Sequence, residues 1–326
     1  MFFSAKKVFL RSEAQGRAIP MIISERAGLL IISRSFKELT MSVLTAIFQA
    51  VFQAITFIFP ISESGHSSMF HDFAGRFDAS ASMLTGAVHI GIALGIIIAL
   101  YKLFLSLTTE FFATFGDIFK KRIKGSQPTP KRKFMYYSLL SFAPMVFWLI
   151  PTGKNGFLFS LLKKTGFNGT LFDDGIFFLI TGALLLLAIR QLHLSKNDKN
   201  ISLVFALIIG FASLLLVPVA GLSFIGGVFC ILMLLGVTKK LSLRYAFVLS
   251  APVLVVMGVI EMCTAANPAG VVAIIIGIIL SAAASFVCVK LLHWVINNDK
   301  LKYFAYYDLG LGVLTLIIGI FELIFR

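Results

Sequence analysis

The chain reads Pro60-Ile61-Ser62-Glu63-Ser64-Gly65-His66 directly after a run of mostly apolar residues at 42–59. This stretch combines a helix breaker, two hydroxyls, an acid, a glycine and an imidazole. Polar and ionisable residues at membrane depth are costly and usually mark a function. Non-helical backbone at that depth persists only where it is buried in protein or lines a wet cavity. The stretch is therefore a candidate site placed inside an interrupted membrane segment.

The composition is that of a polytopic, all-α membrane protein. Of the 326 residues 58% are hydrophobic and only 13% are charged, and the mean hydropathy is +0.95. Several apolar runs reach the roughly 20 residues that a helix needs to cross a bilayer. The formal net charge of +14 comes from basic residues in short loops, the pattern of the positive-inside rule, and we expect no nucleic-acid partner. The three cysteines lie in apolar runs without metal-ligand spacing, so we expect no zinc site.

Six transmembrane helices are predicted, at about 83–104, 134–151, 173–191, 243–263, 270–292 and 304–325. Two further apolar stretches, 42–60 and 201–217, each end in a proline followed by small or polar residues. We interpret them as the first arms of two re-entrant helical hairpins. Their second arms are expected near 66–80 and 222–236.

Charge gives this layout an orientation. With loop 120–133 in the cytoplasm, 17 of the 29 lysines and arginines fall on the inner side and five on the outer side, as the positive-inside rule requires. The first hairpin then opens to the outside and the second enters from the cytoplasm. Pro60 and Pro218 end comparable half-helices in opposite orientations, which predicts an inverted repeat with a binding site near the membrane midplane.

The domain organisation follows from this repeat. Residues 41–326 are predicted to form a single integral membrane domain, with a first repeat over about 41–151 and a second over about 173–326. Residues 1–40 hold seven basic residues and lack the single apolar core of a signal peptide. They are either an amphipathic surface segment or a non-native extension with initiation at Met41, and we favour the second interpretation.

The stretch from Gln53 to His66 resembles the first signature of the undecaprenyl-diphosphate phosphatase family of the bacitracin-resistance type. That signature reads roughly E-G-x-T-E-F-L-P-(I/V)-S-S-(S/T)-G-H. Further similarity lies in Gly236-Val237-Thr238-Lys239, in the segment from Phe247 to Pro252, and in the entry to the last helix at Tyr303–Tyr307. The resemblance implies six spans with two oppositely oriented hairpins. It also implies a polyprenyl phosphate or diphosphate partner and a plasma-membrane location in a bacterial cell. It leaves the cofactor open, with a divalent cation as the candidate.

The sequence departs from the family pattern at several motif positions. The two signature acids fall on Gln53 and Phe57, and a signature serine falls on Glu63. The second signature, P-G-x-S-R-S-G, falls on 220–226, so that its arginine position holds Phe224. A last-helix arginine position holds Asp308.

The candidate site residues follow from the retained and altered positions. We predict His66, Ser62 and Glu63 as catalytic residues, and a ligand-binding set made of Ser64, Gly65, Gln53, Arg76 and Ser223. Ser62 and Ser64 have an alternative role as caps of the second half-helix. His89, within an apolar helix, is expected to be a hydrogen-bonded core histidine.

Three functions remain open at this point. The first is hydrolysis of a polyprenyl diphosphate, which recycles the carrier lipid of cell-wall synthesis at the outer face. The second is a non-catalytic relative that binds or flips an isoprenoid phosphate, which the replaced acids and arginine favour. The third is transport of another small anion, which only the repeat and the Glu/His cluster suggest. The fold alone does not decide among them.

Overall fold

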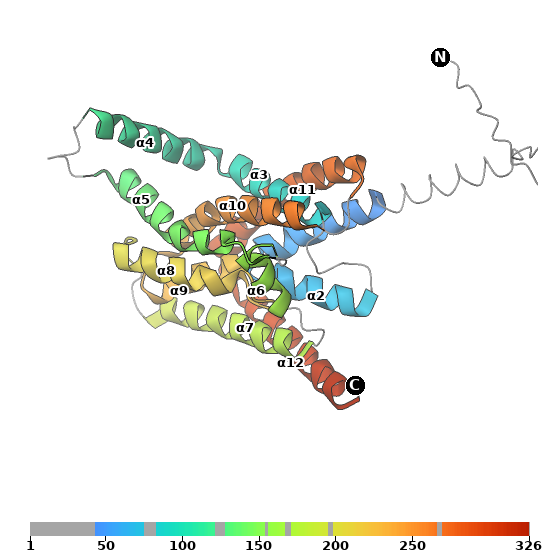
Figure 1. Ribbon diagram of the computed structural model, residues 1–326. Helices are drawn as coiled ribbons and strands as arrows, with labels where there is room; N and C mark the ends of the chain where they lie inside the picture. Colours follow the sequence, from blue (N-terminus) through green and yellow to red (C-terminus); the bar gives the residue numbers. More distant parts are fainter. Residues whose placement is uncertain are drawn as a thin grey trace, which may run out of the picture.

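The computed structural model describes residues 43–74, 83–120, 128–153, 156–166, 171–194, 198–265 and 269–325. These residues form helices joined by short connections (Figure 1). The predicted N-terminal extension at 1–40 lies outside the described residues, and so does Arg76.

Four helices of the described chain are long and apolar enough to cross a membrane: α7 (Leu171–Leu194), α10 (Lys239–Thr264), α11 (Val271–Asn297) and α12 (Lys302–Phe325). They cover the predicted spans at 173–191, 243–263, 270–292 and 304–325. The helix α3 (Met83–Ala99) and the helix α4 (Tyr101–Phe119) would make a fifth span if the bent pair were counted as one. The chain is thus an all-helical, multi-pass membrane protein.

The predicted span at 83–104 is broken. Leu100 leaves helical geometry with φ −116° and ψ 30°, and α4 turns by 90° from the direction of α3. In Figure 1, α4 extends away from the main bundle beside α5 (Pro130–Phe142). Thr114 is the buried residue of α4, so this helix presents most of its apolar surface outward.

The predicted span at 134–151 is also interrupted. The helix α5 ends at Phe142, and a 3₁₀ helix, η1 (Ala143–Leu149), continues the segment. Pro144 explains the change, because proline lacks the backbone donor of an α-helix and its ring clashes with the preceding turn. The helix α6 (Leu158–Gly166) follows η1 and packs against it.

Two pairs of short helices lie where the two hairpins are predicted, and in each pair the first helix is apolar. The first pairs the helix Val43–Ile58 with α2 (Glu63–Ala74). The second pairs α8 (Leu203–Leu216) with α9 (Phe224–Leu234). The second arm of the first hairpin begins at Glu63, three residues earlier than expected, because Ser62 rather than His66 ends the turn.

The two hairpin turns touch each other. A Cβ atom on Gly65 would lie 2.9 Å from the Cα of Gly221, and one on Gly226 would lie 2.9 Å from the Cβ of Pro60. Gly221 has a φ of +85°, a conformation that favours glycine. The starts of α2 and α9 therefore meet at close range, although their sequences lie about 160 residues apart.

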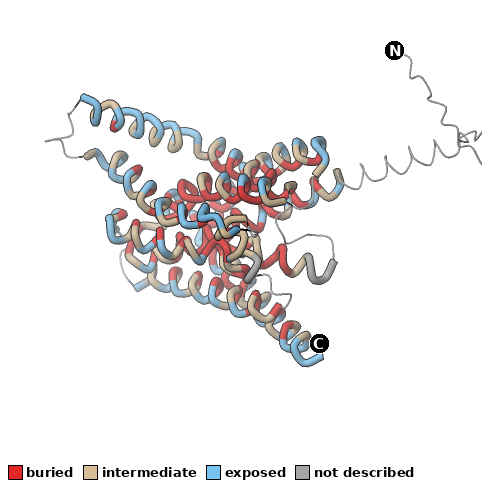
Figure 2. The backbone as a smooth tube through the Cα atoms, viewed as in Figure 1, coloured by how far each residue is buried: buried red, intermediate tan, exposed pale blue. Residues whose placement is uncertain are grey.

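Small residues let the long helices approach closely. The helix α7 packs along α12, and α3 packs along α11 and α10. Gly175 of α7 and Gly312 of α12 lie at the first interface, and Gly91 and Gly95 of α3 face serines of α11 at the second. Such small-residue interfaces are typical of helices in membranes. Buried residues concentrate in the centre of the bundle, and apolar side chains remain exposed around it (Figure 2).

Candidate functional site

The first hairpin turn is organised by Ser62. Its backbone lies in the left-handed region with φ 60°, which is uncommon for a residue with a side chain. The Ser62 Oγ accepts a hydrogen bond from the Gly65 backbone N–H at 3.2 Å, and this bond caps α2. The Ser64 hydroxyl lies 3.3 Å from the Ser62 hydroxyl. The capping role expected as an alternative for Ser62 is thus present.

His66 is held by two hydrogen bonds. Its Nδ1 lies 2.7 Å from the Ser62 backbone carbonyl, and its Nε2 lies 2.7 Å from the hydroxyl of Tyr307 in α12. The two rings are stacked with centroids 5.7 Å apart, and the Phe178 ring meets the imidazole edge-on. Because the Ser62 carbonyl can only accept, Nδ1 donates to it, and in a neutral imidazole Nε2 would accept from Tyr307.

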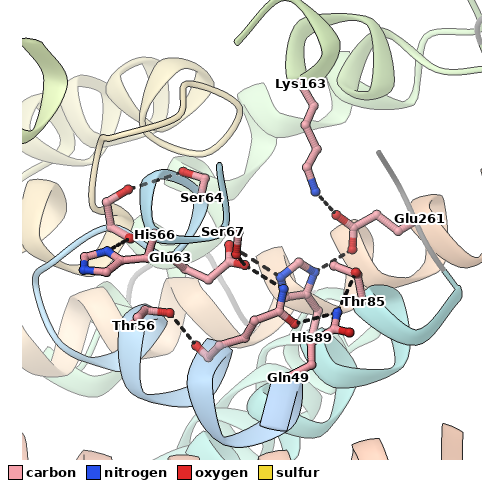
Figure 3. A network of polar contacts seen from close by, with 12 residues as sticks. Gln49, Thr56, Glu63, Ser64, His66, Ser67, Thr85, His89, Lys163 and Glu261 are labelled. Carbon is pink, nitrogen blue, oxygen red and sulfur yellow. Dashed lines mark hydrogen bonds and ion pairs between the residues drawn. The ribbon is translucent and has the colours of Figure 1, made fainter. Parts of the chain in front are cut away.

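Glu63 lies at the centre of a polar network (Figure 3). One carboxylate oxygen, Oε1, accepts hydrogen bonds from the Gln53 amide at 2.9 Å and from the Ser67 hydroxyl at 3.1 Å. Gln49 continues the network by donating to Thr85 at 2.9 Å and to Gln53 at 3.4 Å. The Glu63 acid therefore sits directly beside the Gln53 amide.

Three ionisable side chains from other helices extend this network. The Nε2 of His89 lies 3.8 Å from the second carboxylate oxygen of Glu63, and its Nδ1 lies 2.6 Å from Glu261. Lys163 donates to the other oxygen of Glu261 at 2.5 Å. His89 is thus a bonded core histidine, as expected.

The second hairpin turn has a matching cap and an apolar contact. Ser223 accepts a hydrogen bond from the Gly226 backbone N–H at 3.1 Å and caps α9. Phe224 begins this helix, and its ring lies 6.5 Å from that of Phe57 in the first hairpin. The contact between the two turns brings Ser223 to the same junction as the first-turn residues.

Most of the predicted site residues lie close together in the structure, but they form two neighbouring groups. Ser62, Ser64, Gly65 and His66 form the first turn, while Gln53 and Glu63 bond to each other beside it. His66 and Glu63 each bond to other partners, and His66 pairs with Tyr307. The residues that the sequence reasoning missed as site members are Tyr307, Glu261 and Lys163. A lone acid in an apolar run is the signal that could have identified Glu261.

A divalent cation, the cofactor that the resemblance suggests, finds no ready-made protein cage in the part of the chain that the structure describes. Among the described residues, no group of three or more His, Cys, Asp or Glu side chains is arranged to hold a metal ion. Magnesium is commonly held by one or two carboxylates together with substrate phosphates. The described contacts of Glu63 are instead to Gln53, Ser67 and His89, so the site gives no observation that fits a bound metal ion.

Comparison with known proteins places this arrangement in a family. The model of a family described as bacitracin resistance protein BacA matches residues 46–314. An undecaprenyl-diphosphatase of Methanosphaera stadtmanae is 29% identical, over 86% of this chain and 99% of its own length. One of Halothermothrix orenii is 29% identical over 86% of this chain and all of its own length. One of Oceanobacillus iheyensis is 30% identical over 81% of this chain and 92% of its own.

The family match begins within the helix Val43–Ile58 and ends within α12, so it includes both hairpin turns together with α7, α10 and α11. Relatives occur in archaea as well as in bacteria, so the similarity does not restrict the source to a bacterium. The chain belongs to the BacA, or undecaprenyl-diphosphatase, family, because the family model matches most of its length, including both hairpin turns.

Proposed function

We propose that this protein binds a polyprenyl phosphate or diphosphate at the junction of its two hairpin turns, on the outer side of the plasma membrane. We further propose that it hydrolyses the diphosphate at least about a thousandfold more slowly than its active relatives, on the scale set by the loss of transition-state donors. The observation that carries the proposal is the meeting of the two capped helix starts at Gly65 and Gly221.

The junction suits an anionic head group. The first-turn N–H groups of a helix lack partners within the helix, and the helix dipole favours negative charge at this end. Two such ends meet here, from α2 and α9, and each is capped by a serine. Discontinuous helices of inverted repeats commonly bind anionic substrates in this way.

The site also holds features that slow hydrolysis. Breaking a phosphoanhydride requires positive charge near the phosphoryl oxygens and a positioned base or nucleophile. Family positions for an acid and an arginine are filled here by Phe57 and Phe224, whose rings lie 6.5 Å apart. The same observation favours a second candidate function, a non-catalytic binder or flippase of the lipid phosphate.

Phosphate release tests the first proposal directly. Purified protein in detergent is given undecaprenyl diphosphate beside an active family member, and binding is followed by the rise in melting temperature with polyprenyl phosphates. A bound ligand raises stability in proportion to the logarithm of its concentration over its dissociation constant. Binding with slow turnover is the expected result. Binding without turnover would favour the non-catalytic candidate, and the absence of both would favour transport of another solute.

A reconstruction tests the proposed cause of slow turnover. The double variant Phe57→Glu with Phe224→Arg places opposite charges where the two rings now meet. We expect turnover to rise about a hundredfold, the usual value of one transition-state donor. The single variant Phe224→Arg should lose stability, because a buried charge without a partner is strongly destabilising. The control is Phe57→Leu with Phe224→Leu, and a folded double variant no faster than this control would contradict the proposed cause.

A further inference from the structure

Four ionisable side chains from four helices lie in contact, one after another, beside the first hairpin turn, and we call them the charge network. Glu63 comes from α2, His89 from α3, Glu261 from α10 and Lys163 from α6 (Figure 3). His89 and Glu261 are fully buried, whereas the Lys163 side chain is 15% exposed and the Glu63 side chain 10%. The charge network thus extends from Lys163, which is partly exposed, through the buried His89 and Glu261 to Glu63 in the candidate site.

The balance of charge within this network determines whether the His89 ring is protonated. Buried charges are tolerated only when they are paired and hydrogen-bonded. Glu63 and Glu261 supply two negative charges and Lys163 supplies one positive charge. With these charges, the four side chains sum to zero only when His89 carries a proton on both ring nitrogens. The resulting imidazolium faces a carboxylate on each side.

One oxygen of Glu63 accepts no hydrogen bond from the residues that the structure describes. Its Oε1 is occupied by Gln53 and Ser67. Its Oε2 lies 3.8 Å from His89 Nε2, which is beyond hydrogen-bonding reach but close enough for an ion pair. Among the described residues, His89 Nε2 has no hydrogen-bond partner. The imidazole therefore supplies charge to this carboxylate without blocking it.

We propose that His89, Glu261 and Lys163 are positioning residues that hold Glu63 ionised, with Oε2 free to accept a proton. This inference rests on the proposed function at the same site. A water molecule attacks the terminal phosphorus of the polyprenyl diphosphate and transfers a proton to Glu63. The P–O–P bridge then breaks, leaving a polyprenyl monophosphate and inorganic phosphate. Glu63 later releases the proton to solvent, so that atoms and charge balance.

The charge state of His89 can be measured without any turnover. Nitrogen-15 NMR of histidine-labelled protein distinguishes an imidazolium from a neutral ring, and the variant His89→Gln assigns the signal among the five histidines. We expect both ring nitrogens of His89 to be protonated at neutral pH, and this signature to be lost in Glu261→Gln. A neutral His89 in the folded wild-type protein would overturn the proposal even if the protein hydrolyses its substrate.

Kinetics provide the second test. In His89→Gln and Glu261→Gln, kcat should fall about a hundredfold, as for a misplaced catalytic group, while KM stays within about twofold, as expected when only transition-state interactions are lost. Lys163→Arg should keep most of the activity that Lys163→Met loses. The control is His293→Gln, since His293 makes its hydrogen bond within α11. Unchanged kcat in the first two variants would refute the proposal.

The two tests separate this inference from the proposed function. A wild-type protein with neither binding nor turnover would refute the proposed function, while the NMR signature of His89 would still decide whether the charge network exists as described. If the proposed function and this inference both hold, NMR will show an imidazolium at His89, and kcat will fall in the variants of this network but not in the control.

Discussion

At the scale of single residues, the hydroxyl of Tyr307 makes a hydrogen bond to His66 from outside the first hairpin. It lies 2.7 Å from His66 Nε2, and the rings are stacked. Tyr307→Phe keeps the ring but leaves a buried nitrogen without its partner. Leaving a buried polar group unsatisfied costs about 1 to 3 kcal/mol.

We therefore expect Tyr307→Phe to lower the melting temperature and to reduce the shift produced by polyprenyl phosphates. Tyr306→Phe is the matched control, because Tyr306 is the neighbouring residue of the same helix and is 58% exposed. Equal melting temperatures and ligand responses for the two variants would show that the bond to His66 contributes neither stability nor order to the site.

The sequence was informative about this turn because its residues are close neighbours. Ser62 and Ser64 are within two positions of each other, and the capping function of Ser62 depends only on local backbone geometry. The hydrogen-bonding and ion-pair partners of Glu63 and His66 could not be predicted from local sequence. His89, Glu261 and Tyr307 come from helices whose packing depends on tertiary structure, and one sequence contains no record of those contacts.

At the scale of helices, the interface between α7 and α12 depends on the absence of side chains. A Cβ atom on Gly312 would lie 2.9 Å from the backbone nitrogen of Leu179 and 3.0 Å from the carbonyl of Gly175. Backbone atoms cannot move aside as a flexible side chain can. Two positions earlier on the same helix, a Cβ on Gly310 would meet nothing within 4 Å.

Gly312→Ala and Gly310→Ala should thus change stability in opposite directions. Overpacking of this kind typically costs about 1 to 3 kcal/mol, whereas replacing an exposed helical glycine by alanine gains up to about 1 kcal/mol. Thermal unfolding in detergent measures the difference. A Gly312→Ala protein as stable as Gly310→Ala would mean that α7 and α12 are not packed this closely.

The length of the apolar runs predicted the four long helices, but not the interruptions of the other two predicted spans. The break after Phe142 has a signal in the sequence, because Pro144 lies within the apolar run 134–151 and proline interrupts an α-helix. The 90° bend at Leu100 had none, since neither proline nor glycine lies at that position. Hydropathy measures how apolar a segment is and not whether its axis stays straight.

At the scale of the whole molecule, the two halves repeat one local design. In each, a short apolar helix ends in a turn, a serine caps the next helix, and a glycine follows three residues after that serine. Ser62 with Gly65 and Ser223 with Gly226 are the corresponding pairs. The two turns contact each other through Gly65 and Gly221, while the opposite orientation of the two halves in the membrane stays a prediction from the charge pattern.

The orientation of this repeat is the remaining prediction at this scale. Basic residues place loop 120–133 in the cytoplasm and the loop around Asn155 outside, as the positive-inside rule requires. The test uses a protein in which the three cysteines are replaced by alanine and one new cysteine is introduced, either Gln127→Cys or Asn155→Cys. A membrane-impermeant maleimide should label the Asn155→Cys protein in intact cells and the Gln127→Cys protein only after lysis. The reverse labelling pattern would place the junction of the two turns on the cytoplasmic side of the membrane instead of the outer side. Because the proposed function has the ligand bound on the outer side of the membrane, that pattern would also contradict the proposed site of ligand binding.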